Sequence, residues 1–212
     1  MRTQKDKGTI AVGGREMVLS KNMQKLVAGS STIRKLFEEG IELAKEVGAE
    51  NVYDFSLGNP AAPVPEEVKK SIYDILENRN ANFVHCYMPN AGYPEVREKV
   101  AANLNKKYNS SFTKDDIIMT VGAAGGINCV LRSLLEPEDE VLCFAPFFGE
   151  YNSYVMNFGG NLKVVPADYE TFQLNVEEAD KYITERTKAV IINNPNNPSG
   201  VVYNKETLIR LQ

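Results

Sequence analysis

The chain has 212 residues, of which 43% are hydrophobic and 25% charged, and this is the composition of a globular protein. Its longest unbroken apolar run, Val141 to Ala145, is far shorter than the roughly 20 residues that a membrane span needs. The net charge of −4 comes without a cluster of Lys and Arg, which argues against nucleic acid as the main partner. The cysteines, Cys86, Cys129 and Cys143, form no CxxC pair, and His85 cannot complete a zinc site with them. We therefore expect no metal, and free thiols in a reducing cytoplasm.

The first part of the chain predicts an extension, helices and a connector. Residues 1 to 16, MRTQKDKGTIAVGGRE, have neither a helical nor a strand period, so we predict a disordered extension. Apolar residues at helical spacing predict a helix from Thr32 to Val47. The stretch VYDFSLGNPAAPVP predicts an extended connector, because it is rich in proline. Two further helices are predicted, from about Pro65 to Arg79 and from about Pro94 to Tyr108, each with proline in its first turn.

Short apolar strands then alternate with helices. In chain order we predict a strand at IIMTVG, a helix over Ala124 to Leu135, a strand at EVLCFA, a helix after Phe148, a strand at LKVVPA, a helix from Val176 and a strand at KAVIINN. The strands lack polar–apolar alternation, as expected when both faces are covered. Right-handed strand–helix–strand units predict an α/β fold with a mostly parallel, doubly wound sheet and flanking helices. KETLIRLQ begins like a helix and stops without a closing strand, so we expect a fragment with an incomplete sheet.

Ligands of open parallel sheets bind beyond the carboxyl ends of the strands, and three stretches are predicted to lie there. In TVGAAGGI, residues 120–127, a strand turns through glycine into a helix, whose free N–H groups can bind an anion. The pattern is neither GxGxxG nor a P-loop, so it does not predict a nucleotide site. The alternative is a tight turn without a ligand.

The second and third stretches are FAPFFGEY, residues 144–151, and NNPNNPSG, residues 193–200. Phe148 follows a proline and precedes a glycine, so its ring can stack on a planar ligand; the alternative is an ordinary core residue. Two Asn-Pro pairs stiffen the last loop and can present the amide of Asn197; the alternative is a structural turn. Together the three stretches predict a site for a phosphorylated, hydroxyl-bearing aromatic compound such as pyridoxal 5′-phosphate.

The sequence resembles the class I/II aminotransferases of the fold type I pyridoxal-phosphate family. The stretches that carry the resemblance are FSLGNP, YMPNAGYPEVRE, IIMTVGAAGGI, DEVLCFAPFFGEY and TKAVIINNPNNPSGVVY, and it extends from about Val18 to Gln212. The resemblance implies pyridoxal 5′-phosphate as cofactor, amino acids and 2-oxo acids as substrates, and a homodimer when intact. It also implies an N-terminal arm and small-domain segment over residues 17–60, and the first part of the cofactor-binding large domain over residues 61–212.

The resemblance assigns cofactor contacts to the three stretches. Asn197 resembles the asparagine that donates a hydrogen bond to the phenolic oxygen of the cofactor. Phe148 resembles the aromatic residue that stacks on the pyridine ring. Gly122, Ala123 and Ala124 resemble the loop whose backbone N–H groups hold the phosphate, and the two alanines leave backbone contacts alone to do so.

Other roles are implied outside these stretches. Tyr87 resembles a tyrosine that reaches the phosphate of the neighbouring subunit, and Gly58 resembles a glycine whose backbone contacts the substrate carboxylate. The Schiff-base lysine, the aspartate at the pyridine nitrogen and the carboxylate-binding arginine of the family all lie downstream of the NPSG motif. Neither Lys188, which begins a strand, nor Lys205, which opens a helix, has the required context. We assign no catalytic residue and expect the chain alone to be inactive.

The leading hypothesis is pyridoxal-phosphate-dependent transamination between an amino acid and a 2-oxo acid in the intact enzyme. A β-lyase of the same fold, acting on sulfur-containing amino acids, is the nearest alternative. A non-catalytic cofactor-binding fragment is a second alternative. A nucleotide-binding module is disfavoured, because the chain has neither GxGxxG nor the phosphate-loop lysine. We expect no nucleic-acid or membrane partner.

Overall fold

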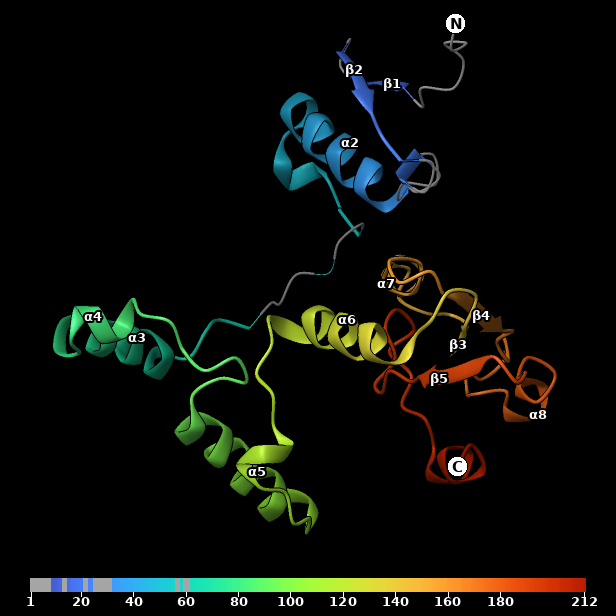
Figure 1. The fold of residues 1–212 in the computed structure, drawn as a ribbon. Coiled ribbons are helices and arrows are strands. Elements are labelled where there is room, and N and C mark those ends of the chain that lie inside the picture. Colours follow the sequence, from blue (N-terminus) through green and yellow to red (C-terminus); the bar gives the residue numbers. More distant parts are fainter. Residues whose placement is uncertain (1–8, 13–14, 21–22, 25–31, 56–57, 59–61) are drawn as a thin grey trace, which may run out of the picture. The chain divides into compact units, whose positions relative to one another are not determined.

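The computed structural model describes residues 9–12, 15–20, 23–24, 32–55, 58 and 62–212 (Figure 1). Contacts divide the chain into two units, residues 1–86 and 87–212, and each is described by itself. In these described parts no helix is both long enough and apolar enough to cross a membrane.

The first unit begins with a β-hairpin. Strand β1 (Thr9–Val12) pairs antiparallel with β2 (Arg15–Val18), and Ile10 lies opposite Met17. Residues 9–12 and 15–16 thus differ from the disordered extension that we predict over residues 1–16, of which residues 1–8 and 13–14 lie outside the described part. Backbone hydrogen bonds can pair two short segments even where neither shows a strand period in its side chains.

In its described part the first unit continues with α2 (Thr32–Val47), the 3₁₀ turn η1 (Ala49–Asn51), α3 (Glu66–Asn78) and α4 (Ala81–Val84). The predicted helices at α2 and α3 are confirmed. Helix α3 starts after Pro65 and has two glutamates in its first turn, where the helix dipole favours negative charge. None of its residues is buried.

The second unit begins with α5 (Pro94–Tyr108), as predicted, and the 3₁₀ turn η2 (Lys114–Asp116). The strand predicted at IIMTVG does not form, and this prediction is wrong. The reason lies in its hydrogen bonds. Met119 N–H donates to the carbonyl of Ala91 over 2.9 Å, and the Ile117 carbonyl accepts from Arg97 Nε over 2.8 Å. These partners replace a neighbouring strand.

The remaining elements build a parallel sheet with helices on both faces: α6 (Gly122–Leu134), β3 (Glu140–Phe144), α7 (Glu150–Met156), β4 (Asn161–Val165), α8 (Val176–Ala179), β5 (Thr187–Ile191) and α9 (Lys205–Arg210). The described strands lie in the order β4-β3-β5, with Leu142 opposite both Lys163 and Val190. The predicted α/β fold with a parallel sheet and flanking helices is confirmed.

The central strand β3 is buried along its whole length, and its side chains alternate between two cores. Leu142 and Phe144 belong to a cluster that continues to Tyr203, with Leu208 of α9 packed against it. Val141 belongs to the other cluster, which comprises residues of α6 and α7. Burial of one such aliphatic side chain contributes about 1.5 to 3 kcal/mol. The two cores place helices on opposite faces of the sheet (Figure 1).

Helix α6 runs from the carboxyl edge of the sheet to its amino edge. A Cβ atom at Gly160, just before β4, would lie 3.0 Å from Cδ1 of Leu135, directly after α6. Nearer to the middle of the helix, Ile127 packs against the same cluster as Ile191, the last residue of β5. Because 13 helical residues extend about 20 Å, Gly122 lies at the edge where the strands end.

Candidate functional site

The asparagines of the loop after β5 differ in their hydrogen bonds. Asn193 Oδ1 accepts a hydrogen bond from the backbone N–H of Asn197 over 2.7 Å. Asn194 Oδ1 accepts from the backbone N–H of Tyr203 over 3.0 Å. The Asn197 side chain is exposed, and its amide bonds to no described residue. The loop thus uses its other asparagines to hold its own backbone and leaves the Asn197 amide open to a ligand.

Asn196 connects this loop to the loop after β3. The residue is 6% exposed, and its Nδ2 donates to the carbonyl of Pro146 over 2.9 Å and to Ser199 Oγ over 2.8 Å. Its backbone N–H donates to the Val201 carbonyl over 2.9 Å, and its own carbonyl accepts from Gly200 N–H over 2.7 Å. The sequence alone does not single out Asn196, because in NNPNNPSG only burial distinguishes it from the asparagine that follows.

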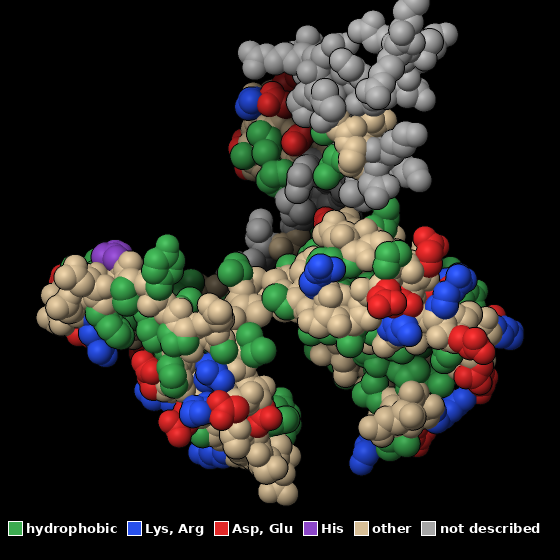
Figure 2. Space-filling model, viewed as in Figure 1, with side chains coloured by type: hydrophobic (Ala, Val, Ile, Leu, Met, Phe, Trp, Pro, Cys, Tyr) green, Lys and Arg blue, Asp and Glu red, His purple; other side chains and the backbone are tan. Residues whose placement is uncertain are grey.

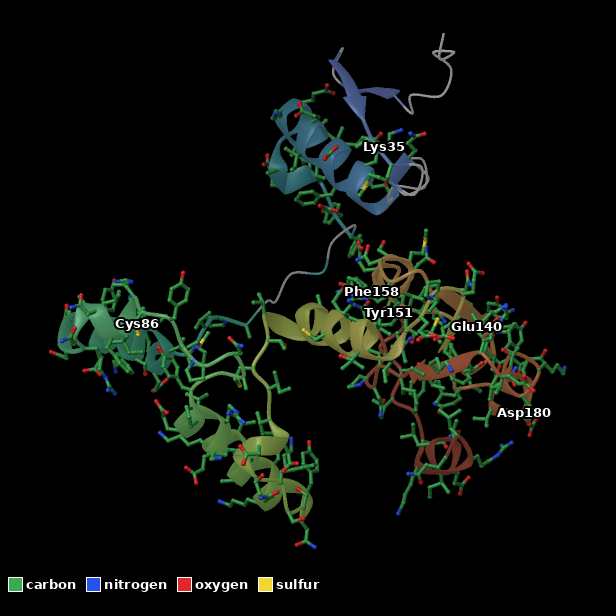
Figure 3. The ribbon with its side chains drawn as sticks, in the orientation of Figure 1. Lys35, Cys86, Glu140, Tyr151, Phe158 and Asp180 are labelled. Atoms are coloured by element: carbon green, nitrogen blue, oxygen red, sulfur yellow. The ribbon has the colours of Figure 1, made fainter. Side chains whose placement is uncertain are left out.

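The loop after β3 presents one aromatic ring. Phe148 is 38% exposed, so it is not the core residue of the alternative interpretation. The ring of Tyr151, on α7 (Figure 3), meets it edge to face, with centroids 5.7 Å apart and an angle of 83°. Tyr151 is buried, and burial raises the pKa of its phenol, which therefore stays neutral. One edge contact orients the Phe148 ring and leaves part of its surface available for stacking.

The first turn of α6 supplies backbone N–H groups. Gly122 has a φ of 66°, a left-handed conformation that glycine adopts without strain, and its N–H donates to the Thr120 carbonyl over 3.0 Å. The Thr120 hydroxyl in turn donates to the Gly122 carbonyl over 3.0 Å. The N–H groups of Ala123 and Ala124 have no partner within their own helix, because they belong to its first turn. They, rather than Gly122, are the groups that can bind an anion.

The other predicted positions lie elsewhere. Tyr87, at the start of the second unit, is fully exposed. Gly58 is exposed and belongs to the first unit. Lys188, near the start of β5, lies 3.9 Å from Asp139 Oδ1, at the amino edge of the sheet. Lys205 is the first residue of α9.

The structure therefore brings three of the predicted features to one edge of the sheet. Asn197 and Phe148 lie on loops that a hydrogen bond joins, and α6 begins at the same edge. An open amide, an exposed ring and free N–H groups match a planar ligand with a hydroxyl and a phosphate. These groups can bind and orient a ligand, but an amide, a phenyl ring and backbone N–H groups are not acids or bases that move a proton.

Fold and site together describe an α/β protein whose sheet carries an open amide, an exposed aromatic ring and free backbone N–H groups at its carboxyl edge. The family model described as "Aminotransferase class I and II" matches residues 49–212. The chain belongs to this family.

Relatives of known name agree with the match. The chain is 34% identical over 171 residues to a probable aspartate/prephenate aminotransferase of Aquifex aeolicus, covering 79% of this chain and 42% of the relative. It is 37% identical over 195 residues to aromatic-amino-acid aminotransferase 2 of Thermococcus litoralis, covering 91% and 47%. The chain thus spans less than half the length of these two relatives.

A solved aminotransferase structure from Eubacterium rectale has the same fold as the chain. It superimposes with a TM-score of 0.87 at 40% identity, over 92% of this chain and 49% of that one. An aspartate aminotransferase from Thermus thermophilus superimposes with a TM-score of 0.80 at 31% identity, over 91% and 49%.

Proposed function

We propose that the protein carrying this chain transfers an amino group between an amino acid and a 2-oxo acid, with pyridoxal 5′-phosphate as cofactor. One observation carries the proposal. Asn193, Asn194 and Asn196 each bond within the protein, whereas the Asn197 amide is exposed and bonds to no described residue. A loop held by three of its asparagines presents the fourth at the edge where this family fold binds ligands.

The residues of the chain fit the cofactor group by group. Asn197 Nδ2 would donate to the ring hydroxyl oxygen, and Phe148 would cover one face of the ring and exclude water from it. The N–H groups of Ala123 and Ala124, aided by the dipole of α6, would hold the phosphate. When bound, the cofactor supplies an electron sink for charge that develops at the substrate Cα.

We also propose that the lysine that carries the cofactor covalently is not among these 212 residues. Of the two lysines nearest to Asn197 in sequence, Lys188 pairs with Asp139 at the opposite edge of the sheet, and Lys205 begins α9. The chain alone should therefore bind the cofactor through its phosphate and hydroxyl contacts and not transaminate.

Two further roles remain proposals that the exposure of the residues supports. The exposed ring of Tyr87 would reach the phosphate site of a partner subunit in a homodimer. The backbone of Gly58 would contact the substrate carboxylate, and among the described residues that are not its chain neighbours no atom lies within 4 Å of a Cβ position there. Sedimentation of the whole protein as a fully active monomer would refute the role of Tyr87. The division into an arm over residues 17–60 and a large domain over 61–212 also stays a prediction.

Cofactor titration tests the proposal. Loss of a hydrogen bond to a charged oxygen costs about 1.5 to 3 kcal/mol, so Asn197→Ala should weaken binding of pyridoxal phosphate roughly 10- to 100-fold and shift its absorption spectrum. Asn103→Ala is the matched control, because Asn103 is also exposed but lies on α5. Equal affinity and spectra for both variants would support the turn-only interpretation of the loop.

The reaction type needs a separate experiment. Transamination yields a new amino acid from the 2-oxo acid, whereas a β-lyase releases a thiol and ammonia without an amino acceptor. Product analysis of the whole protein with both substrate types separates the two. For residues 1–212 alone, borohydride reduction with pyridoxal phosphate should label no single lysine. One specifically labelled lysine together with turnover would show that the chain contains its own catalytic lysine.

A further inference from the structure

We propose that Asn196 is a positioning residue that sets the distance and orientation between the Phe148 ring and the Asn197 amide. The inference rests on the proposed function, because these two groups contact the cofactor there. Asn196 itself would touch no ligand, since it is 6% exposed and its side-chain N–H groups are used inside the protein.

The side-chain amide of Asn196 donates hydrogen bonds to two different loops. A side-chain amide has two N–H groups, which point in different directions. One donates to Ser199 Oγ within its own loop, and the other to the Pro146 carbonyl, 50 residues away in sequence. In the described part of the chain, no other hydrogen bond joins the loop of residues 145–149 to that of residues 192–204.

The Pro146 carbonyl is an effective point of attachment. Proline has no N–H group, so its carbonyl is the only backbone group there that can accept or donate. Ala145 N–H before it donates to the Val165 carbonyl over 2.9 Å, which anchors the loop to the sheet. Phe148 after it is held through its carbonyl, which accepts from Tyr151 N–H over 3.0 Å. Asn196 therefore restrains the middle of a segment whose two ends are already bonded.

The other end of the connection reaches Asn197 directly. Asn196 precedes it in the chain, and the Asn197 N–H is bonded to Asn193 Oδ1 over 2.7 Å. The backbone on both sides of the Asn197 side chain is thus fixed relative to Asn196. A shift of the Asn196 amide would move the open amide and the Phe148 loop relative to each other. Small errors of this kind weaken the binding of a ligand that both groups contact.

Asn196→Asp tests the role with little change in size, because a carboxylate oxygen replaces the donor that faces Pro146. A hydrogen bond contributes about 0.5 to 1.5 kcal/mol, so we expect affinity for pyridoxal phosphate to fall roughly 3- to 10-fold in the whole protein. Ser199→Ala is the matched control, since it removes the bond within the loop and leaves the Pro146 bond in place. It should change affinity less than twofold, about the range expected of a distant site.

Two further experiments distinguish a positioning role of Asn196 from a general loss of stability. In a background with both Phe148→Ala and Asn197→Ala, Asn196→Asp should no longer change affinity, because the groups that it positions are gone. An equal fall in both backgrounds would overturn the inference. Without cofactor, hydrogen exchange of amides 147–152 should speed up in Asn196→Asp and not in Ser199→Ala.

The outcomes distinguish the two proposals. Unsubstituted protein that does not bind pyridoxal phosphate would refute the proposed function. Unchanged exchange at residues 147–152 in Asn196→Asp would overturn the positioning role, whatever the cofactor does. Asn196→Ser, whose side chain is shorter, repeats both arms if the aspartate variant does not fold.

Discussion

The two edges of the parallel sheet are built on opposite principles. At the amino edge, Glu140 is 2% exposed and accepts a hydrogen bond of 2.6 Å from the Thr184 hydroxyl. Lys163 Nζ lies 3.3 Å and Arg186 Nη2 3.7 Å from its Oε1. At the carboxyl edge the candidate site consists of neutral groups, and the Asn197 amide has no partner among the described residues.

This difference in pairing distinguishes groups that stabilise the fold from groups that remain free to bind a ligand. The Thr184 hydrogen bond above all, followed by Lys163 and Arg186, holds the pKa of Glu140 below its ordinary value, so the buried carboxylate remains charged. Figure 2 shows acidic and basic side chains side by side over this part of the molecule. A charge that is buried must be paired, whereas an exposed neutral amide can stay open at little cost.

The largest effect on stability is expected from a substitution in β3, the central strand that runs from one edge to the other. Leu142 of β3 is fully buried, and Leu→Ala in such a core costs about 2 to 5 kcal/mol. Leu142→Ala should lower the free energy of unfolding in denaturant by this amount. Leu134→Ala is the matched control, because Leu134 is 47% exposed, and it should change that free energy by less than about 0.5 kcal/mol. Similar losses in both variants would contradict the position of β3 at the centre of the core.

The next largest effect on stability is expected at Asn196, and it should differ from the effect at the neighbouring Asn197. Asn196→Ala removes a buried side chain and leaves the half-buried Pro146 carbonyl without its donor, which should lower the free energy of unfolding by about 1 to 3 kcal/mol. Asn197→Ala should change it by less than about 0.5 kcal/mol, because its side chain is exposed. Chemical denaturation of both variants measures the difference, and a larger loss in Asn197→Ala would reverse the assignment of structural and ligand-binding roles.

Glu140 at the amino edge should make the stability of the protein depend on pH. Because the folded pKa of Glu140 is lowered, its contribution is present above the ordinary pKa of 4.5 and is lost as the pH falls through the folded value. Glu140→Gln should therefore lower the denaturation midpoint near neutral pH, and the gap to the unsubstituted protein should narrow in acid. Glu177→Gln, at an exposed pair with Arg210, is the control and should change the midpoint little. A gap that widens on acidification would contradict the lowered pKa.

The smallest effect is expected in the chemical labelling of the Cys143 thiol, which lies in β3. Burial raises the pKa of the Cys143 thiol to about 12, whereas Cys86 and Cys129 are exposed. Since the thiolate is the reactive form, two thiols should react with a disulfide reagent in the folded protein and the third only in denaturant. Cys143→Ser should leave the count for the folded protein unchanged. Rapid reaction of all three thiols before unfolding would show that β3 opens to solvent.

Local patterns of the sequence were sufficient for much of this architecture. Apolar spacing and proline in the first turn predict α5 with its observed bounds, and continuous apolar runs predict β3, β4 and β5. Parallel connectivity then places the loops with Phe148 and Asn197 at one edge of the sheet. These features depend on neighbours in the chain, so the sequence alone determines them.

Other features depend on partners far away in the chain. IIMTVG has the composition of a strand, yet Ala91 and Arg97 take its backbone hydrogen bonds. Asn196 and Asn197 are the same residue type in the same motif. Only the tertiary structure decides which is buried against Pro146 and which is open to a ligand, because an amide is held inside the protein only where a distant carbonyl accepts its hydrogen bond.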